Sequence, residues 1–178
     1  CDWSSDVCSS DLVVVDTDEP PMIVSAVLQN GTWSWAPNGE IVKKTREELP
    51  NSTKTETTIK YAVTIQGSLT KPMPLIPAQA LQIVPVGKIP DKLGELLTYR
   101  VTWMGKPAAG AGVINDMVND PDAVELKTKA DGTVTLPVRN QGLNVIRAVL
   151  VTPSDNPAKT DRYEHTATLA FTLAHKPE

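Results

Sequence analysis

The stretch Tyr163–His175 (YEHTATLAFTLAH) alternates apolar and polar side chains, which is typical of a β-strand with one buried face. The apolar positions are Ala167, Leu169, Phe171 and Leu173, and the polar positions are Glu164, Thr166, Thr168 and Thr172. Successive side chains of a strand point to opposite faces. The stretch therefore predicts an extended segment that covers a hydrophobic core with one of its faces.

The same alternation recurs in three stretches further upstream. They are Ile59–Leu69, Leu97–Trp103 and Val134–Val138. Turn-forming residues separate these stretches, among them the dipeptide Asp131-Gly132. Short strands at regular spacing with turn residues between them are typical of two packed sheets. The sequence thus predicts an all-β fold, an antiparallel β-sandwich of the immunoglobulin-like or transthyretin-like type.

Three prolines in Lys71–Pro77 predict a boundary, because proline lacks the backbone N–H that a continuing strand needs. We expect a smaller N-terminal β unit at residues 13–70 and a C-terminal sandwich at residues 78–176.

Within the N-terminal unit, Asn30-Gly31 predicts a hairpin turn, since both residues tolerate positive φ. Lys43–Leu49 favours one or two helical turns that end at Pro50, and Asn51–Thr58 is typical of a loop or an exposed edge.

Composition excludes several classes of function. The chain has 178 residues, of which 40% are hydrophobic, and its 17 basic and 21 acidic side chains give a net charge of −4. Binding to nucleic acid depends on neutralising phosphates, so this acidic balance without a basic stripe argues against it. The apolar runs are far shorter than the roughly 20 residues of a membrane-spanning helix. We therefore expect a folded protein with no nucleic-acid partner and no membrane span.

The first twelve residues (CDWSSDVCSSDL) differ from the rest of the chain, because they are small, polar and aperiodic. They resemble the translated read-through of sequencing-adapter DNA, so we interpret residues 1–12 as a non-native segment. Cys1 and Cys8 would otherwise suggest a metal site or a disulfide. A structural zinc site needs four ligands, and this pair has no neighbouring cysteine or histidine.

Several segments, in their order and spacing, resemble a known family. They are KYAVTIQG (60–67), LQIVPV (81–86), GELLTYRVTWMGKPAAGAGV (94–113), TKADGTVTLPV (128–138) and YEHTATLAFTL (163–173). They are similar to a bacterial periplasmic family of domains of unknown function that is linked to nickel uptake as a substrate-specific region. The GKPAAGAGV and ADGTVTLPV segments also resemble the carboxypeptidase regulatory module and transthyretin.

This resemblance implies a periplasmic or secreted, non-enzymatic protein associated with a divalent metal, nickel or cobalt, or with a membrane transport component. Members often carry a further histidine after the penultimate strand, where this chain has Val149, Leu150 and Val151.

The residues themselves offer few metal ligands. Nickel prefers imidazole and carboxylate donors. His165 lies near the start of the last strand, and His175 is ten residues further on, about 33 Å away in an extended chain, so the two cannot share an ion. His165 is therefore the candidate nickel ligand, and its alternative is a half-buried histidine at the end of the sandwich.

A second candidate metal site is the acidic loop NDMVNDPD, which suits calcium better than nickel. Its possible ligands are Asp116, Asp120 and Asp122. The loop lacks the regular spacing of a calcium-binding loop, and such residues also form turns that bond to their own backbone.

Two tryptophans suggest a different kind of site. Trp33 and Trp35 share one face of a short strand, where they either stack on a glycan or protein partner or cover the core. The chain has no GxSxG, HExxH or P-loop motif, so we expect no enzyme activity. Three hypotheses stay open: an accessory protein for a divalent metal, an interaction module without metal, and a hydrolase acting through a carboxylate pair.

Overall fold

The computed structural model describes residues 17–19 and 21–174, and the regular structure within them is entirely β. The strands are β1 (Ile23–Trp35), β2 (Ile41–Val42), β3 (Lys54–Ile65), β4 (Leu81–Val86), β5 (Leu96–Trp103), β6 (Lys106–Pro107), β7 (Gly112–Ile114), β8 (Leu126–Lys127), β9 (Thr133–Pro137), β10 (Gly142–Pro153) and β11 (Arg162–Leu173). Cys1, Cys8, the adapter-like residues 1–12 and His175 lie outside the described residues.

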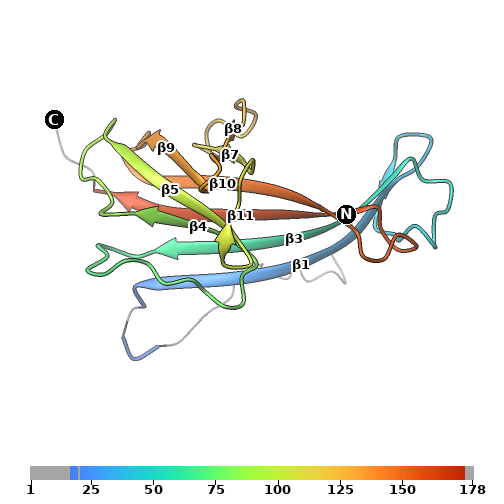
Figure 1. Cartoon of the computed structure of the whole chain (residues 1–178), viewed down its shortest axis with the longest axis horizontal. Helices are drawn as coiled ribbons and strands as arrows, with labels where there is room; N and C mark the ends of the chain where they lie inside the picture. The colour runs from blue at the N-terminus through green and yellow to red at the C-terminus, as the bar shows by residue number, and fades with distance from the viewer. Residues whose placement is uncertain (1–16, 20, 175–178) are drawn as a thin grey trace, which may run out of the picture.

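The strands form two sheets (Figure 1). Sheet A has the order β2-β1-β3-β11-β10-β7-β8, and its adjacent strands are antiparallel except for the parallel pair β3 and β11. Sheet B contains β4, β5 and β6 in that order, and β9 also pairs with β5. The four long strands of sheet A run side by side, and sheet B covers only one end of them.

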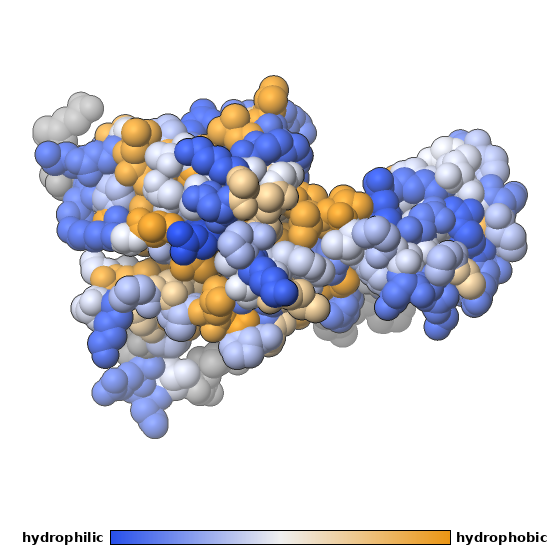
Figure 2. Space-filling model, in the orientation of Figure 1, coloured by the Kyte–Doolittle hydropathy of each residue, from blue (hydrophilic) through white to orange (hydrophobic). Residues whose placement is uncertain are grey.

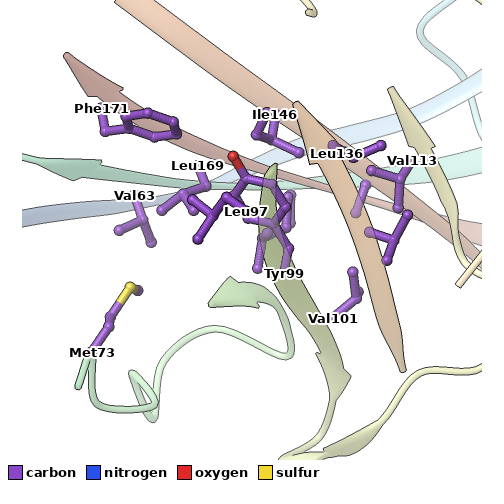
Figure 3. Close-up of a cluster of buried hydrophobic side chains, with 14 of the residues drawn as sticks. Val63, Met73, Leu97, Tyr99, Val101, Val113, Leu136, Ile146, Leu169 and Phe171 are labelled. Atoms are coloured by element: carbon purple, nitrogen blue, oxygen red, sulfur yellow. The ribbon is translucent and has the colours of Figure 1, made fainter. Parts of the chain in front are cut away.

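The hydrophobic core lies where the two sheets overlap. The inner face of sheet A, which we define as the face toward sheet B, contributes Val63, Ile146, Leu169 and Phe171. Sheet B contributes Leu97, Tyr99, Val101 and Leu136 from the opposite side. Figure 3 shows these side chains gathered between the sheets, with Met73 added from the loop before β4. The predicted all-β sandwich and the alternation that predicted it are confirmed.

Strands from both predicted units share sheet A. β1 and β3 come from residues 13–70, and β10 and β11 come from residues 78–176. β3 pairs with β11 over ten residues, from Glu56 with Arg162 to Ile65 with Phe171. The two ranges are therefore joined by main-chain hydrogen bonds and by one continuous core.

The predicted hairpin at Asn30-Gly31 is wrong. β1 runs through this dipeptide as one strand, and its pairing with β3 shifts by one residue between Gln29 and Gly31. Asn30 is the extra residue of a β-bulge, and its side-chain amide donates to Thr58 Oγ1 at 2.8 Å. Gly31 has φ of +90°, so the conformational freedom that favours a turn serves here to accommodate a bulge.

Beyond the end of sheet B, the long strands lead to a second region, which we call the polar end (residues 34–56 and 153–162). Its interior consists of hydroxyl groups. Thr55 Oγ1 lies 3.0 Å from Ser34 Oγ and 2.9 Å from Ser52 Oγ, and all three residues are buried. Asp161 Oδ2 accepts hydrogen bonds from the Thr55 amide and from Arg46.

Two local expectations for the polar end are therefore wrong. Residues 51–58 are not simply a loop or an exposed edge, since β3 begins at Lys54 and buries Thr55 and Glu56. Lys43–Leu49 forms turns rather than a helix. Glu48 accepts hydrogen bonds from the amide and the hydroxyl of Thr45, and the loop is then fixed to Lys159 by the Arg46 amide.

Candidate functional site

His165 lies on the inner face of β11, at the position where sheet B ends. Its exposed fraction is 6%. Its Nδ1 lies 3.1 Å from the hydroxyl of Tyr61 on β3, and its Nε2 lies 3.4 Å from Thr152 Oγ1 on β10. Residues two apart along a strand share a face. Side chains from three neighbouring strands of sheet A can therefore meet here, on its inner face.

Aromatic rings surround this histidine. Trp103, at the end of β5, packs its ring 4.3 Å from the imidazole ring centre, and Tyr163 lies 6.3 Å away on the other side. We call His165, Tyr61, Trp103, Tyr163 and Thr152 the His165 cluster. The cluster lies where sheet B stops along the long strands, because β5 ends at Trp103. Figure 2 shows hydrophobic side chains between a larger and a smaller part of the molecule. The cluster thus closes the apolar core on the side of the polar end.

The surroundings of His165 favour its neutral form. Burial lowers its pKa below the ordinary value, because a buried imidazolium loses its hydration. Burial likewise raises the pKa of Tyr61, so its hydroxyl keeps its proton. A neutral imidazole has one donor and one acceptor nitrogen, and hydroxyls can play either role. Tyr61 and Thr152 can therefore satisfy both ring nitrogens.

These contacts do not fit a nickel site. A metal ligand needs a free ring nitrogen and further donors, usually imidazole or carboxylate groups. Both nitrogens of His165 face hydroxyls, and among residues 17–19 and 21–174 no group of three His, Cys, Asp or Glu side chains is placed to hold an ion. In the described part of the chain, His165 has the contacts of a structural residue.

The three aspartates of the acidic loop do not converge on one point. Asp116 is buried and accepts hydrogen bonds from the amide and side chain of Asn119 and from Asn140 Nδ2. Burial would raise the pKa of Asp116, but the hydrogen bonds from Asn140 and Asn119 outweigh it and lower the pKa. Asp120 forms an ion pair with Arg139 at 3.2 Å, whereas Asp122 is exposed. Asp116 thus joins its loop to the loop before β10.

Trp33 and Trp35 lie on the outer face of β1, the face away from sheet B, and both are half-buried. Lys54 Nζ lies 4.0 Å from the ring centre of Trp35, and Lys43 Nζ lies 5.9 Å from that of Trp33. A cation over an aromatic face is attracted by the negative charge of the ring. A lysine therefore lies over one face of each of the two tryptophan rings that the sequence suggested as contacts for a glycan or protein partner.

The outer face of sheet A is a feature that the search for ligand residues missed. A hollow of about 240 Å³ crosses three strands of this face, where small side chains lie beside the larger Lys60. Ala26 and Leu28 of β1, Ala62 of β3 and Thr166 and Thr168 of β11 are among its lining residues. On β3 and β11 the signal was present in the sequence, as threonine and alanine on the polar side of the strand. On β1 it was the alternation of Met22, Val24, Ala26 and Leu28.

Comparison with known proteins assigns the chain to a family. A family model described as a domain of unknown function (DUF4198) matches residues 10–152. The chain belongs to the DUF4198 family. No curated protein and no solved structure matches it.

For this family member, the match confirms one part of the resemblance found in the sequence, the assignment to a domain of unknown function. The match carries no information about nickel uptake. Within the described residues, no helix is long and apolar enough to cross a membrane. Function must therefore be argued from the surface and from the contacts of the candidate residues.

Proposed function

We propose that this protein is a non-enzymatic periplasmic accessory protein of divalent-metal uptake, which acts as an interaction module for a transport component. The observation that carries the proposal is the outer face of sheet A. Flat, uncovered sheet faces of small and β-branched residues suit protein contacts, and exposed apolar surface often marks such sites. The link to nickel or cobalt rests on the family resemblance of the sequence.

Two kinds of observation support an interaction role over metal binding by the described residues. Three buried ionisable side chains already have protein partners: His165 has two hydroxyls, Asp116 has two asparagines, and Glu56 has Arg162 and Lys54. Meanwhile, the outer face presents Val24 and Leu28 of β1 to solvent beside the hollow at Ala62. The polar chemistry is used inside the fold, whereas the outer face combines exposed apolar side chains of β1 with Lys60 of β3 and the threonines of β11.

The first test is nickel accumulation in host cells that lack the gene and are complemented with variants. Ala62→Arg places a long cationic side chain in the hollow of the outer face, so we expect lost accumulation with a normal amount of folded protein. Ala130→Arg is the matched control, because Ala130 is an exposed residue in the turn before β9. Equal accumulation with both variants would contradict the proposed interaction face.

The second test separates this role from ion binding at His165. The intact protein is titrated with nickel, cobalt and calcium by calorimetry, beside His165→Ala. We expect His165→Ala and the unchanged protein to give the same heat of binding with each of the three ions. A nickel signal that disappears in His165→Ala would show that the imidazole is a ligand and would overturn the interaction role in favour of direct metal binding.

A further inference from the structure

Among the residues that the structure describes, strand β1 has one edge that is open along most of its length. β3 covers one edge from Ile23 to Trp35, whereas β2 pairs with the other edge only at Ser34 and Trp35. Within the described residues, no other strand pairs with β1. An open strand edge presents unpaired N–H and C=O groups that can bond to another strand.

The hydrogen bonds identify which residues face this open edge. The Gln66 amide donates to the Met22 carbonyl, and Gln79 Nε2 reaches the carbonyls of both Ala26 and Ala62, so even-numbered residues bond toward β3. Bonding direction alternates along a strand. The N–H and C=O groups that point away from β3 therefore belong to Ile23, Ser25, Val27 and Gln29.

Within the described part of the chain, residues 22–29 of this edge also lack the usual protection of a monomer. Natural proteins commonly place charged residues, proline or a bulge on an exposed edge strand. Here residues 22–29 contain neither charge nor proline, and the bulge comes only after Gln29. Val24, Val27 and Leu28 are all exposed, with Leu28 at 55%.

We propose that this edge pairs with the β1 edge of a second copy of the chain, antiparallel about a two-fold axis at Ala26. In this register Val24 of each copy lies opposite Leu28 of the other, on the outer face. These even-numbered residues form the non-hydrogen-bonded pairs of the new ladder, whose side chains approach most closely. A single self-complementary strand thus supplies both the main-chain bonds and the apolar contacts.

Self-complementarity favours a second copy over an unrelated strand. Val24 and Leu28 lie two residues on either side of Ala26, and both are exposed and apolar. A two-fold axis at Ala26 therefore brings these apolar residues of one copy opposite those of the other.

The first experiment measures mass by sedimentation of the full chain over a dilution series. One strand per copy buries less surface than an obligate interface, so we expect a dimer that dissociates on dilution. Ser25→Pro removes an edge-facing N–H without removing a bond to β3, and we expect dimerisation to weaken about tenfold or more. Ser25→Ala keeps that N–H and is the matched control. A monomer at every concentration, or equal dimerisation of both variants, would overturn the proposal.

The second experiment tests the register with pairs of exposed residues. Val24→Lys with Leu28→Lys places like charges opposite each other, so we expect a monomer. Val24→Glu with Leu28→Lys places opposite charges there, so we expect the dimer to persist. Leu143→Lys, an exposed site on β10, controls for added charge. If both double variants behave alike, the two-fold register at Ala26 is wrong.

Hydrogen exchange identifies what covers the edge. We expect the amides of Ile23, Ser25, Val27 and Gln29 to lose protection as the protein is diluted. Protection of these amides in a monomer would mean that the chain's own residues or another strand cover the edge, and would overturn the proposal. The dimer does not depend on a role in metal uptake, so it stands or falls separately from the proposed function.

Discussion

The sandwich and the polar end share the same long strands but are stabilised differently. In the sandwich, Leu169 and Val101 are fully buried among apolar side chains from the opposite sheet. In the polar end, Ser34 and Thr55 are equally buried, yet their neighbours are hydroxyls and backbone carbonyls. Two kinds of interior with the same degree of burial therefore follow each other along one strand. On β3, Thr55 lies in the hydroxyl-lined interior, whereas Val63 lies in the apolar core.

The difference lies in what each interior tolerates. Apolar burial is proportional to area and has no direction, so a core accepts other apolar side chains of similar volume. A hydrogen-bonded interior depends on direction. A buried donor or acceptor without its partner has lost its hydrogen bonds to water and gains none in the protein. We therefore expect volume changes to matter most in the sandwich and isosteric changes to matter most in the polar end.

The largest effect is expected in the sandwich. Leu169→Ala leaves a cavity between the sheets and should lower the free energy of unfolding by about 2–5 kcal/mol. Leu143→Ala is the matched control, since Leu143 is 50% exposed, and it should change the free energy far less. Urea denaturation monitored by circular dichroism measures both. Similar values for the two variants would contradict the position of the core.

The next effect is expected in the polar end. Thr55→Val keeps the volume but removes the hydroxyl between Ser34 and Ser52, and should cost about 1–3 kcal/mol. The matched control is Thr135→Val, whose hydroxyl bonds to Thr98 on an exposed surface of sheet B. Urea denaturation should show little change for it. A neutral Thr55→Val would mean that the hydroxyl interior contributes nothing specific.

A smaller effect is expected at Asp161, which is partly exposed to solvent. Burial would raise its pKa, but hydrogen bonds from Arg46 and the Thr55 amide, with the charges of Arg46 and Arg162, lower it. A lowered carboxyl pKa stabilises the fold above the unfolded value, about 3.9 for Asp, and this contribution is lost as the pH falls further. Because solvent screens a carboxylate this exposed, Asp161→Asn should lower the free energy of unfolding by less than about 1 kcal/mol at pH 7 and by less still in acid, as measured by denaturation at several pH values.

The smallest effect at neutral pH is expected at the boundary between the two regions. The pKa of His165 is lowered by burial, so the unfolded chain binds a proton more readily than the folded one. Stability should be constant above about pH 6.5 and should fall as the pH drops below it. His165→Gln, which cannot be protonated, should flatten this part of the profile. Urea denaturation at several pH values measures both profiles, and an unchanged slope in His165→Gln would contradict the prediction.

Alternation along the strands predicted most of the sandwich. Each inward residue of Leu97–Trp103 and of the last strand can be recognised from its neighbours two positions away, because a strand has a period of two. The core positions Val101, Leu136, Leu169 and Phe171 were all identified in this way, and all are buried. Burial of apolar side chains is thus a local property of the pattern.

The polar end could not be predicted in the same way. Asn51–Thr58 has the polar, Thr-rich composition of a loop. Its residues are buried only because of the partners that they contact in the fold. Asp161 is 106 residues from the Thr55 amide, so nothing near Thr55 in the sequence reveals the contact. His165 presents the same difficulty, because Tyr61 and Trp103 reach it from other strands. Patterns within a strand do not specify which strands become neighbours.

The parallel pairing of β3 with β11 has a consequence for how the protein is made. The first long hairpin, β1 with β3, leaves the ribosome about a hundred residues before the strand that completes its sheet. Until Arg162–Leu173 has been synthesised, the β3 edge of that hairpin lacks its neighbouring strand β11. Closing so long a loop slows folding. Sheet A therefore cannot be completed before β11 has been synthesised, and until then the free edge of β3 is available to other strands.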